Sequence, residues 1–263
     1  MPDGTTRRHY TRRIVASELR MPRKVGTTET DARGRAIAGA PRMAPDTFEP
    51  SLAPRVIRLA DVEIRAALRG GKCELRRPLR IVGDLGQIKT LDDVDGNGEQ
   101  WRLTRNYSTD RATYHLTREQ LCKRCPYGIP GVELHVSEWW TCDPSTGEIV
   151  YRADAVTTSD RERIYLSGAS WKITPPPGEM PPRLRWRIVD LWIDRLQPMG
   201  ALQLRNEGWL DARIAKPTEA DARRSREAFA SNWNRSTSDA DYVWSKNPWV
   251  WVMSLARVET QHG

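Results

Sequence analysis

The sequence contains no apolar run near the roughly 18–20 residues needed to cross a bilayer, and its mean hydropathy is −0.66. Its first residues lack the apolar stretch of a secretory signal. Cysteine is scarce, with four residues in the chain. Without a secretory signal, so few cysteines favour a reducing compartment, where free thiols or a metal site are commoner than disulfides. We therefore expect a cytoplasmic protein.

Two familiar catalytic signatures are also missing. The sequence has no glycine-rich phosphate loop of the form G-x-x-x-x-G-K-[ST]. Its four histidines are scattered, so no Ser/His/Asp triad can be assigned. These absences exclude the simplest nucleotide-hydrolase and serine-hydrolase interpretations.

Aromatic residues are unevenly distributed along the chain. Tyr10 and Phe48 are the only ones before residue 100, whereas all 11 tryptophans lie at or beyond Trp101. Residues 1–50 are instead rich in Arg, Thr, Gly and Pro, a composition that buries little apolar surface. We predict a flexible, disordered basic arm over residues 1–50 and a packed domain over residues 51–263. The arm is either a solvated tail or an auxiliary nucleic-acid contact.

The charge of the chain is strongly positive. The formal net charge is +8 and the isoelectric point is about 9.6. Such a balance favours contact with a polyanion, most simply nucleic acid, although a basic surface without a ligand would give the same composition.

Hydrophobic periodicity predicts a mixed α+β domain. Residues 132–140, 187–196 and 249–258 are typical of strands, and the last is apolar on both faces, which indicates a central strand. Residues 219–233 have helical spacing behind the cap Thr218, and Asp61 is a suitable cap for a helix over residues 62–69. Residues 101–107 and 112–116 can pair as short strands. We expect a small mixed β-barrel with flanking helices.

A candidate polar site combines two distant segments. Lys72, Arg76 and Arg77 follow the helix that Gly70-Gly71 ends. Glu138 shares the apolar face of the strand over residues 132–140, because side chains alternate along a strand. A lysine beside a carboxylate can transfer a proton or hold a phosphate or a base carbonyl, but it can equally be an ion pair that closes the mouth of a barrel.

Short motifs occur in a fixed order from about residue 50 to the C-terminus. They are G-G-K-C-E-L-R-R-P at residues 70–78, C-P-Y-G-I-P-G at 125–131, Y-R-A-D at 151–154, W-K and M-P-P-R at 171–172 and 180–183, E-G at 207–208, F-x-x-x-W-N at 229–234, and N-P-W-V-W-V at 247–252. The ordered set resembles the ASCH domains carried by bacteriophages and prophages, relatives of the PUA fold. Residues 1–50 have no counterpart in this resemblance.

The resemblance implies a PUA-like β-barrel with a cleft for RNA or a modified nucleoside, in a bacterial host cell. Some ASCH proteins remove the acetyl group from N4-acetylcytidine with a lysine, a threonine and a strand glutamate. Lys72 and Glu138 match the lysine and the glutamate. Cys73 and Leu75 replace the two threonines of the family motif. Cys73 substitutes as a nucleophile only if Lys72 lowers the pKa of its thiol; otherwise it is an inert, buried cysteine.

Further residues are candidates for ligand contact. Arg183 offers a second basic group, Asp154 can recognise an amino group on a base, and Trp140 can stack on one. Either Arg76 or Arg77, but not both, is expected to point into the cleft, because neighbours on a strand face opposite ways.

Zinc is an alternative use of the cysteines. Cys122 and Cys125 form a C-x-x-C pair, and Cys142 with His135 or His115 could complete four ligands. Without a second pair, free or packed thiols explain the same residues. We expect no required cofactor, and treat structural zinc as the alternative.

The leading hypothesis is a phage-type ASCH protein that binds RNA, single-stranded nucleic acid or a modified nucleotide through Lys72, Arg76, Arg77 and Glu138. A second hypothesis is a hydrolase that acts on a modified nucleobase of the N4-acylcytidine type, with Lys72 and Glu138 as its acid and base. A third is a structural or assembly factor of the phage particle that uses the arginine-rich arm. No membrane contact is expected, and the sequence identifies no protein partner.

Overall fold

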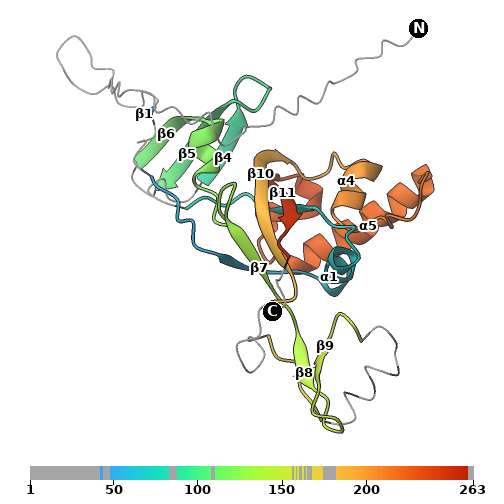
Figure 1. Cartoon of the computed structure of the whole chain (residues 1–263). Coiled ribbons are helices and arrows are strands. Elements are labelled where there is room, and N and C mark those ends of the chain that lie inside the picture. Colours follow the sequence, from blue (N-terminus) through green and yellow to red (C-terminus); the bar gives the residue numbers. More distant parts are fainter. Residues whose placement is uncertain are drawn as a thin grey trace, which may run out of the picture. The chain divides into compact units, whose positions relative to one another are not determined.

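A computed structural model describes residues 42–43, 48–82, 88–107, 110–155, 157, 159, 162, 164, 168–173 and 182–259. These residues form helices and several β-sheets, so the predicted α+β class is confirmed (Figure 1). Most of the predicted basic arm, residues 1–41 and 44–47, lies outside this description. None of the helices within it is both long enough and apolar enough to cross a membrane.

The largest sheet places distant segments side by side. Its five strands run in the order β2 (Arg55–Arg58), β7 (Glu133–Ser137), β10 (Arg185–Arg195), β11 (Trp249–Arg257) and β3 (Glu74–Pro78). β2 is parallel to β7, and the other neighbours are antiparallel. The sheet is therefore mixed, as predicted.

β11 is an interior strand, which confirms the prediction from its apolar sequence. It pairs with β10 on one side and with β3 on the other. Trp251, Met253 and Leu255 belong to one buried apolar cluster, and Val250 and Val252 belong to a second. Both faces of β11 are covered, so neither face carries polar residues until the strand nears its end.

A second sheet contains the predicted hairpin. β5 (Gln100–Tyr107) pairs with β6 (Asp110–Thr117) and with β4 (Ile88–Asp93), and β1 (Arg42–Met43) joins β6 in parallel. β1 comes from the range predicted as the arm. A two-stranded sheet joins β8 (Trp140–Cys142) to β9 (Ile149–Tyr151).

Four α-helices are described: α1 (Asp61–Leu68), α2 (Arg118–Cys122), α4 (Ala201–Asn206) and α5 (Glu219–Ser236). The predicted cap of α5 is confirmed, because the Thr218 side chain accepts a hydrogen bond from the Asp221 N–H. The predicted cap of α1 is wrong. Ala60 precedes the helix and Asp61 is its first residue, while the Glu63 carboxylate accepts the Ala60 N–H at 2.9 Å.

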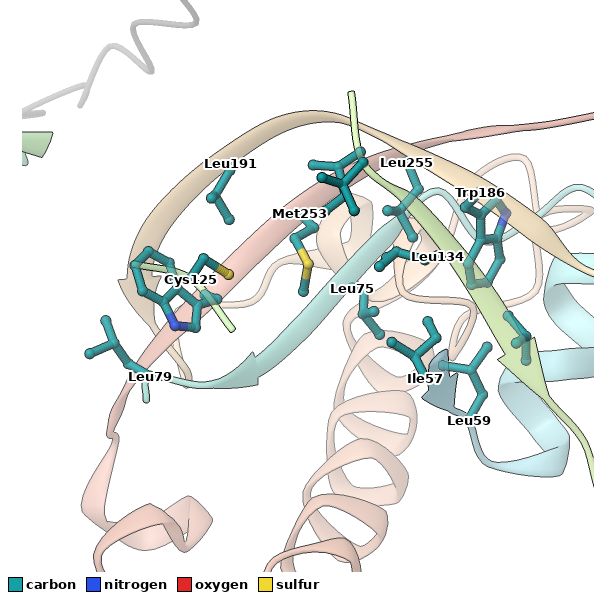
Figure 2. Close-up of a cluster of buried hydrophobic side chains, with 14 of the residues drawn as sticks. Ile57, Leu59, Leu75, Leu79, Cys125, Leu134, Trp186, Leu191, Met253 and Leu255 are labelled. Atoms are coloured by element: carbon teal, nitrogen blue, oxygen red, sulfur yellow. The ribbon is translucent and has the colours of Figure 1, made fainter. Parts of the chain in front are cut away.

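Two apolar clusters cover the two faces of the large sheet. Figure 2 shows part of the first, in which Ile57, Leu75, Leu134, Trp186 and Met253 converge from the five strands. The second is made largely by α4 and α5 on the opposite face, where α5 supplies buried Ala222, Phe229 and Trp233. The sheet therefore lies between two apolar layers.

The β-ladders do not close a barrel among the described strands, because β2 and β3 remain the two edges of the large sheet. One side chain joins these edges. The Arg77 guanidinium, from β3, donates to the carbonyl of Arg58 in β2 at 2.7 Å and to the Arg76 carbonyl at 2.9 Å. The sheet thus curls far enough for a single arginine to reach from one edge to the other.

Candidate functional site

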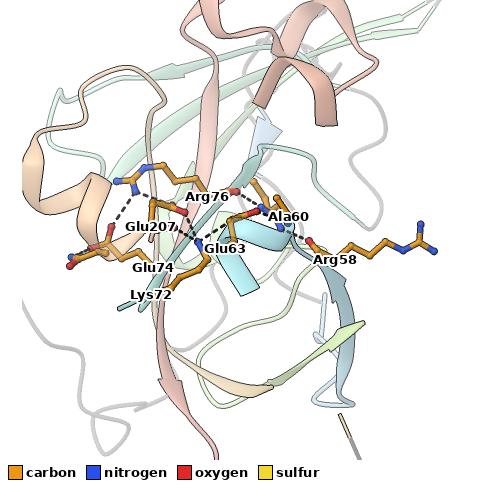
Figure 3. Close-up of polar contacts among 9 residues, drawn as sticks. Arg58, Ala60, Glu63, Lys72, Glu74, Arg76 and Glu207 are labelled. Carbon is orange, nitrogen blue, oxygen red and sulfur yellow. Dashed lines mark hydrogen bonds and ion pairs between the residues drawn. The ribbon is translucent and has the colours of Figure 1, made fainter. Parts of the chain in front are cut away.

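The residues expected to form one site lie in two separate clusters. The first is a buried set of charged side chains, here called the Lys72 network: Glu63, Lys72, Glu74, Arg76 and Glu207 (Figure 3). The Lys72 ammonium is at its centre. It lies 3.1 Å from Glu63 Oε1 and donates to Glu207 Oε2 at 2.8 Å and to the Glu207 carbonyl at 2.9 Å.

Arg76 extends the network along β3. Its Nη1 donates to Glu207 Oε1 at 3.0 Å and to Glu74 Oε2 at 3.2 Å. Asn206 then donates to the other oxygen of Glu74 at 2.8 Å. Glu207 therefore joins two cations, because each of its carboxylate oxygens accepts from a different one.

Two tight turns bring these side chains together. Gly70 has φ +76° where α1 ends, which turns the chain into the segment that carries Lys72. Gly208, with φ +79°, follows Glu207; a Cβ there would lie 2.6 Å from the Ala66 Cβ and 3.3 Å from the Lys72 Cβ. Any larger residue at position 208 would push the end of α4 away from α1 and from Lys72.

Glu63 remains ionised inside the network. Burial raises the pKa of its carboxyl, but the charges of Lys72 and Arg77 and the hydrogen bonds from Ala60 and Lys72 outweigh burial, so the pKa lies below the usual value. Glu63 is thus a buried anion that compensates a buried cation.

The Lys72 network is closed to ligands. The Lys72 side chain is 0% exposed and that of Glu207 is 1% exposed. Buried charges are tolerated when they are paired and hydrogen-bonded, and here each carboxylate meets a cation. This arrangement fits the ion-pair alternative for Lys72 better than a place in an open cleft.

The second cluster, here called the Arg183 site, consists of Glu138, Tyr151, Asp154 and Arg183. Arg183 donates to Glu138 through Nε at 3.2 Å and through Nη2 at 2.6 Å, and to Asp154 through Nη1 at 2.6 Å. Its guanidinium carbon lies 3.7 Å from the centroid of the Tyr151 ring. Arg183 therefore links two carboxylates above an aromatic face.

The Arg183 site is partly open to solvent. The Glu138 side chain is 3% exposed, but those of Arg183 and Asp154 are 27% and 48% exposed. Burial would lower the pKa of Arg183, but hydrogen bonds from Arg183 to Glu138 and Asp154 outweigh it and raise the pKa. The Arg183 guanidinium therefore remains charged, and it reaches solvent, whereas the Lys72 side chain is fully buried.

Strand geometry explains the position of the Arg183 site. β2 and β7 are parallel, so their carboxyl ends lie at the same end of the sheet. α1 begins there after β2, and Glu138 follows β7 there. Arg152 donates to Asp61 in the first turn of α1 at 3.0 Å, and Arg65 donates to the Ala153 carbonyl at 3.1 Å. α1 thereby fixes the segment that carries Tyr151 and Asp154.

Aromatic side chains flank Glu138. Trp139 and Arg152 form a cation–π contact with 5.0 Å from the guanidinium carbon to the ring centroid. Trp140 is buried, and Lys172 Nζ lies 5.3 Å from its ring centroid. Side-chain burial alternates from Val132 to Trp140, as expected for a strand, although β7 ends at Ser137 and β8 begins at Trp140.

The structure thus separates Lys72, Arg76 and Cys73 from Glu138, Asp154 and Arg183. The ion pairs of Lys72 are with Glu63 and Glu207, and that of Glu138 is with Arg183; no Lys72–Glu138 pair occurs in the described part of the chain. Arg77 is occupied by two backbone carbonyls.

The condition for Cys73 to act as a nucleophile, a lowered thiol pKa, is not met. Partial desolvation of the thiol and the charges of Glu74 and Glu207 raise its pKa and outweigh the charge of Lys72, which lowers it. Cys73 is also exposed, so the alternative of a buried cysteine is wrong as well. Its thiol is a weak nucleophile near neutral pH.

The zinc ligands considered from the sequence are not gathered. Across the described residues no three His, Cys, Asp or Glu side chains are grouped as a metal ion would need. Cys122 and Cys125 are free thiols, and burial raises the pKa of each to about 12. Cys142, in β8, is an exposed free thiol, and His135 lies 3.6 Å from Glu133.

Sequence reasoning missed Glu63 and Glu207. Glu63 lies four residues before the buried Ala67 and next to Ile64, so helical spacing alone would place it on the inner face of α1. Glu207 was noted only as part of the E-G motif, and nothing in the sequence pairs it with a lysine 135 positions away.

Comparisons with known proteins identify no relative. No family model matches the chain, and searches of curated proteins and of solved structures give no match.

Proposed function

We propose that this chain binds single-stranded nucleic acid, in the first instance RNA, through bases that enter the Arg183 site. One observation carries the proposal: two carboxylates and an aromatic ring hold a planar cationic group at a partly exposed position. Carboxylates accept hydrogen bonds from base amino and ring N–H groups, and aromatic rings stack on bases. The net charge of +8 supports attraction to a polyanion.

A PUA-like fold of the ASCH type is part of this proposal. The mixed sheet from β2 to β3 is the counterpart of the barrel, with Arg77 joining its two edges in place of a β-ladder. Two of the motifs that carry the resemblance, Y-R-A-D and M-P-P-R, meet at one end of that sheet, where Arg183 donates to Asp154 and to Glu138.

Catalysis is not included in the proposal. The hydrolase hypothesis requires Lys72 and Glu138 to act on one substrate, whereas Lys72 is 0% exposed and bound by Glu63 and Glu207. The assembly-factor hypothesis depends on residues 1–50, most of which lie outside the described structure.

The test compares Glu138, which follows β7, with Glu133, the first residue of β7. Glu138 and Glu133 are each bound by arginine, Glu133 by Arg185 at 2.7 Å and by Arg187 at 3.2 Å. Either Glu→Gln change makes the chain more positive, so simple electrostatics predicts slightly tighter binding for both. If Glu138 accepts hydrogen bonds from a base, Glu138→Gln should weaken binding by about tenfold, while Glu133→Gln should not.

The measurement is fluorescence anisotropy with a short mixed-sequence RNA, its single-stranded DNA counterpart and the RNA duplex. Wild type should bind the single strands in preference to the duplex, and the slope of affinity against salt should be the same in Glu138→Gln as in wild type. Failure of wild type to bind any single strand at low salt would refute the proposal. Equal effects of the two substitutions would place the binding surface elsewhere.

A further inference from the structure

The contact between Arg183 and Glu138 resembles the way a carboxylate binds a nucleobase edge. Two neighbouring N–H donors on one edge of a planar group meet the two carboxylate oxygens, with N–O distances of 3.2 and 2.6 Å. Glu138 is 3% exposed, and Arg183 is the cation that compensates it. Without Arg183, Glu138 would need another pair of donors, because a buried carboxylate without partners is costly.

The remaining contacts of Arg183 also match those of a bound base. Its guanidinium carbon lies 3.7 Å from the centroid of Tyr151, which is a stacking distance. Asp154, the most exposed member of the site, accepts a third hydrogen bond at 2.6 Å. A planar group with donors along its edge therefore satisfies every contact that Arg183 makes.

Among the four standard bases, only guanine has such an edge. Its ring N1–H and its 2-amino group are adjacent donors. Adenine and cytosine place their amino group beside a ring nitrogen that accepts, and uracil has a single N–H between two carbonyls. Against the two oxygens of Glu138, each of those three bases would set an acceptor against an acceptor.

We propose that Arg183 occupies a guanine-binding site in the free protein, and that a guanine of single-stranded nucleic acid takes its place. The N1–H and the 2-amino group donate to Glu138, and the ring stacks on Tyr151. This inference rests on the proposed function and specifies the base that the site selects. No covalent step is involved.

The exchange conserves the hydrogen bonds of the buried carboxylate. Glu138 has two donors before and after binding, so neither oxygen of the buried carboxylate is left without a hydrogen bond, and the cost of the exchange is the lost charge pairing with Arg183. Arg183 is partly exposed and can move its charged end into water. Because Arg183 competes with the ligand, its removal should raise the apparent affinity for guanine, as the removal of any competing state does.

The experiment uses oligouridylates with one central nucleotide varied, bound to the full chain. The central base is guanine, hypoxanthine, 2-aminopurine or adenine. Hypoxanthine lacks the 2-amino donor and 2-aminopurine lacks the N1–H donor. Wild type should bind the guanine strand best, and loss of either donor, in hypoxanthine or in 2-aminopurine, should weaken binding by about tenfold. Arg183→Ala should raise the affinity for the guanine strand by about tenfold without raising the affinity for the adenine strand.

Three variants complete the test. Glu138→Gln should abolish the preference for guanine, and Glu133→Gln should retain it. Arg183→Lys preserves the charge but lacks the paired planar donors, so it still pairs with Glu138 but competes less well than arginine. Its affinity for the guanine strand should therefore rise by less than that of Arg183→Ala. The base series on wild type tests the inference even if neither Arg183 variant folds.

The outcomes separate the two proposals. One outcome is that single strands bind and that Glu138→Gln weakens this binding, while all four central bases bind with the same affinity. In that case the guanine inference is wrong and the proposed function stands. A weaker guanine affinity in Arg183→Ala would also overturn the inference, because Arg183 would then contact the ligand directly. If no single strand binds to wild type, both proposals fail.

Discussion

The Lys72 network and the Arg183 site are built from the same groups and differ in their access to solvent. In both, a cation lies between carboxylates contributed by distant segments. Lys72 is 0% exposed and its donors end on Glu63 and Glu207, whereas Arg183 is 27% exposed beside an open carboxylate. Closed ionic clusters hold elements together, and open ones can exchange a partner. Exposure therefore distinguishes the structural cluster from the candidate site.

The largest expected effect is the loss of stability when the central carboxylate of each cluster is neutralised. Glu207→Gln leaves Lys72 and Arg76 buried without their shared anion and should cost about 3–5 kcal/mol. Glu138→Gln should cost about 1–2 kcal/mol, because Arg183 reaches solvent and retains Asp154. Urea unfolding at neutral pH measures both.

The exposed pair of Arg213 and Asp211 is the control for that comparison. The Arg213 side chain is 83% exposed, so Asp211→Asn should leave the unfolding midpoint unchanged. Equal losses for Glu207→Gln and Glu138→Gln would show that the two clusters do not differ as proposed.

The second prediction concerns acid. Because the pKa of Glu63 is lowered in the folded chain, its contribution is complete above the ordinary glutamate value of 4.5 and is lost as the pH falls through the lowered pKa. The urea midpoint of wild-type unfolding should fall as the pH is lowered through this range, and the midpoint of Glu63→Gln should fall less steeply with pH. If the midpoint of Glu63→Gln depended on pH as steeply as that of wild type, carboxyl groups other than Glu63 would dominate acid unfolding.

The smallest effect is on thiol chemistry beside the closed network. Cys73, next to Lys72, and Cys142 are exposed, whereas burial raises the pKa of Cys122 and Cys125 to about 12. A thiol-specific reagent at mildly alkaline pH should modify Cys73 and Cys142 faster than Cys122 and Cys125, with little change in stability. A chelator should not alter these rates; faster labelling of Cys122 and Cys125 after chelation would indicate bound zinc.

Periodicity predicted the elements that are long and apolar. The strands at β10 and β11 and the helix α5 with its cap Thr218 follow directly from alternating or helical spacing. α4 was not predicted, because six residues are too few for a clear pattern. The predicted cap of α1 was wrong because Glu63, at the third position of the helix, accepts the Ala60 N–H, so a capping side chain before the helix is not needed.

Three of the four members of the candidate site were predicted, but Tyr151 and the grouping of the four were not. Glu138, Asp154 and Arg183 were all named, yet Glu138 was paired with Lys72. Charge and strand alternation show that a side chain points inward, but they do not identify which of many opposite charges it meets. Glu63 and Glu207 take Lys72 because the turns at Gly70 and Gly208 bring α1 and α4 to it.

The Arg77 bridge has a mechanical consequence. Backbone ladders hold every neighbouring pair of strands in the large sheet, but β2 and β3 are joined by side chains: Arg77 donates to the Arg58 carbonyl, and Lys72 pairs with Glu63 in the helix that follows β2. A change in the curl of the sheet at this seam would therefore break no ladder hydrogen bond. α1 follows β2 at the seam, and Glu138 follows β7, the strand paired with β2, so a change in curvature at the seam would move the floor of the Arg183 site as well.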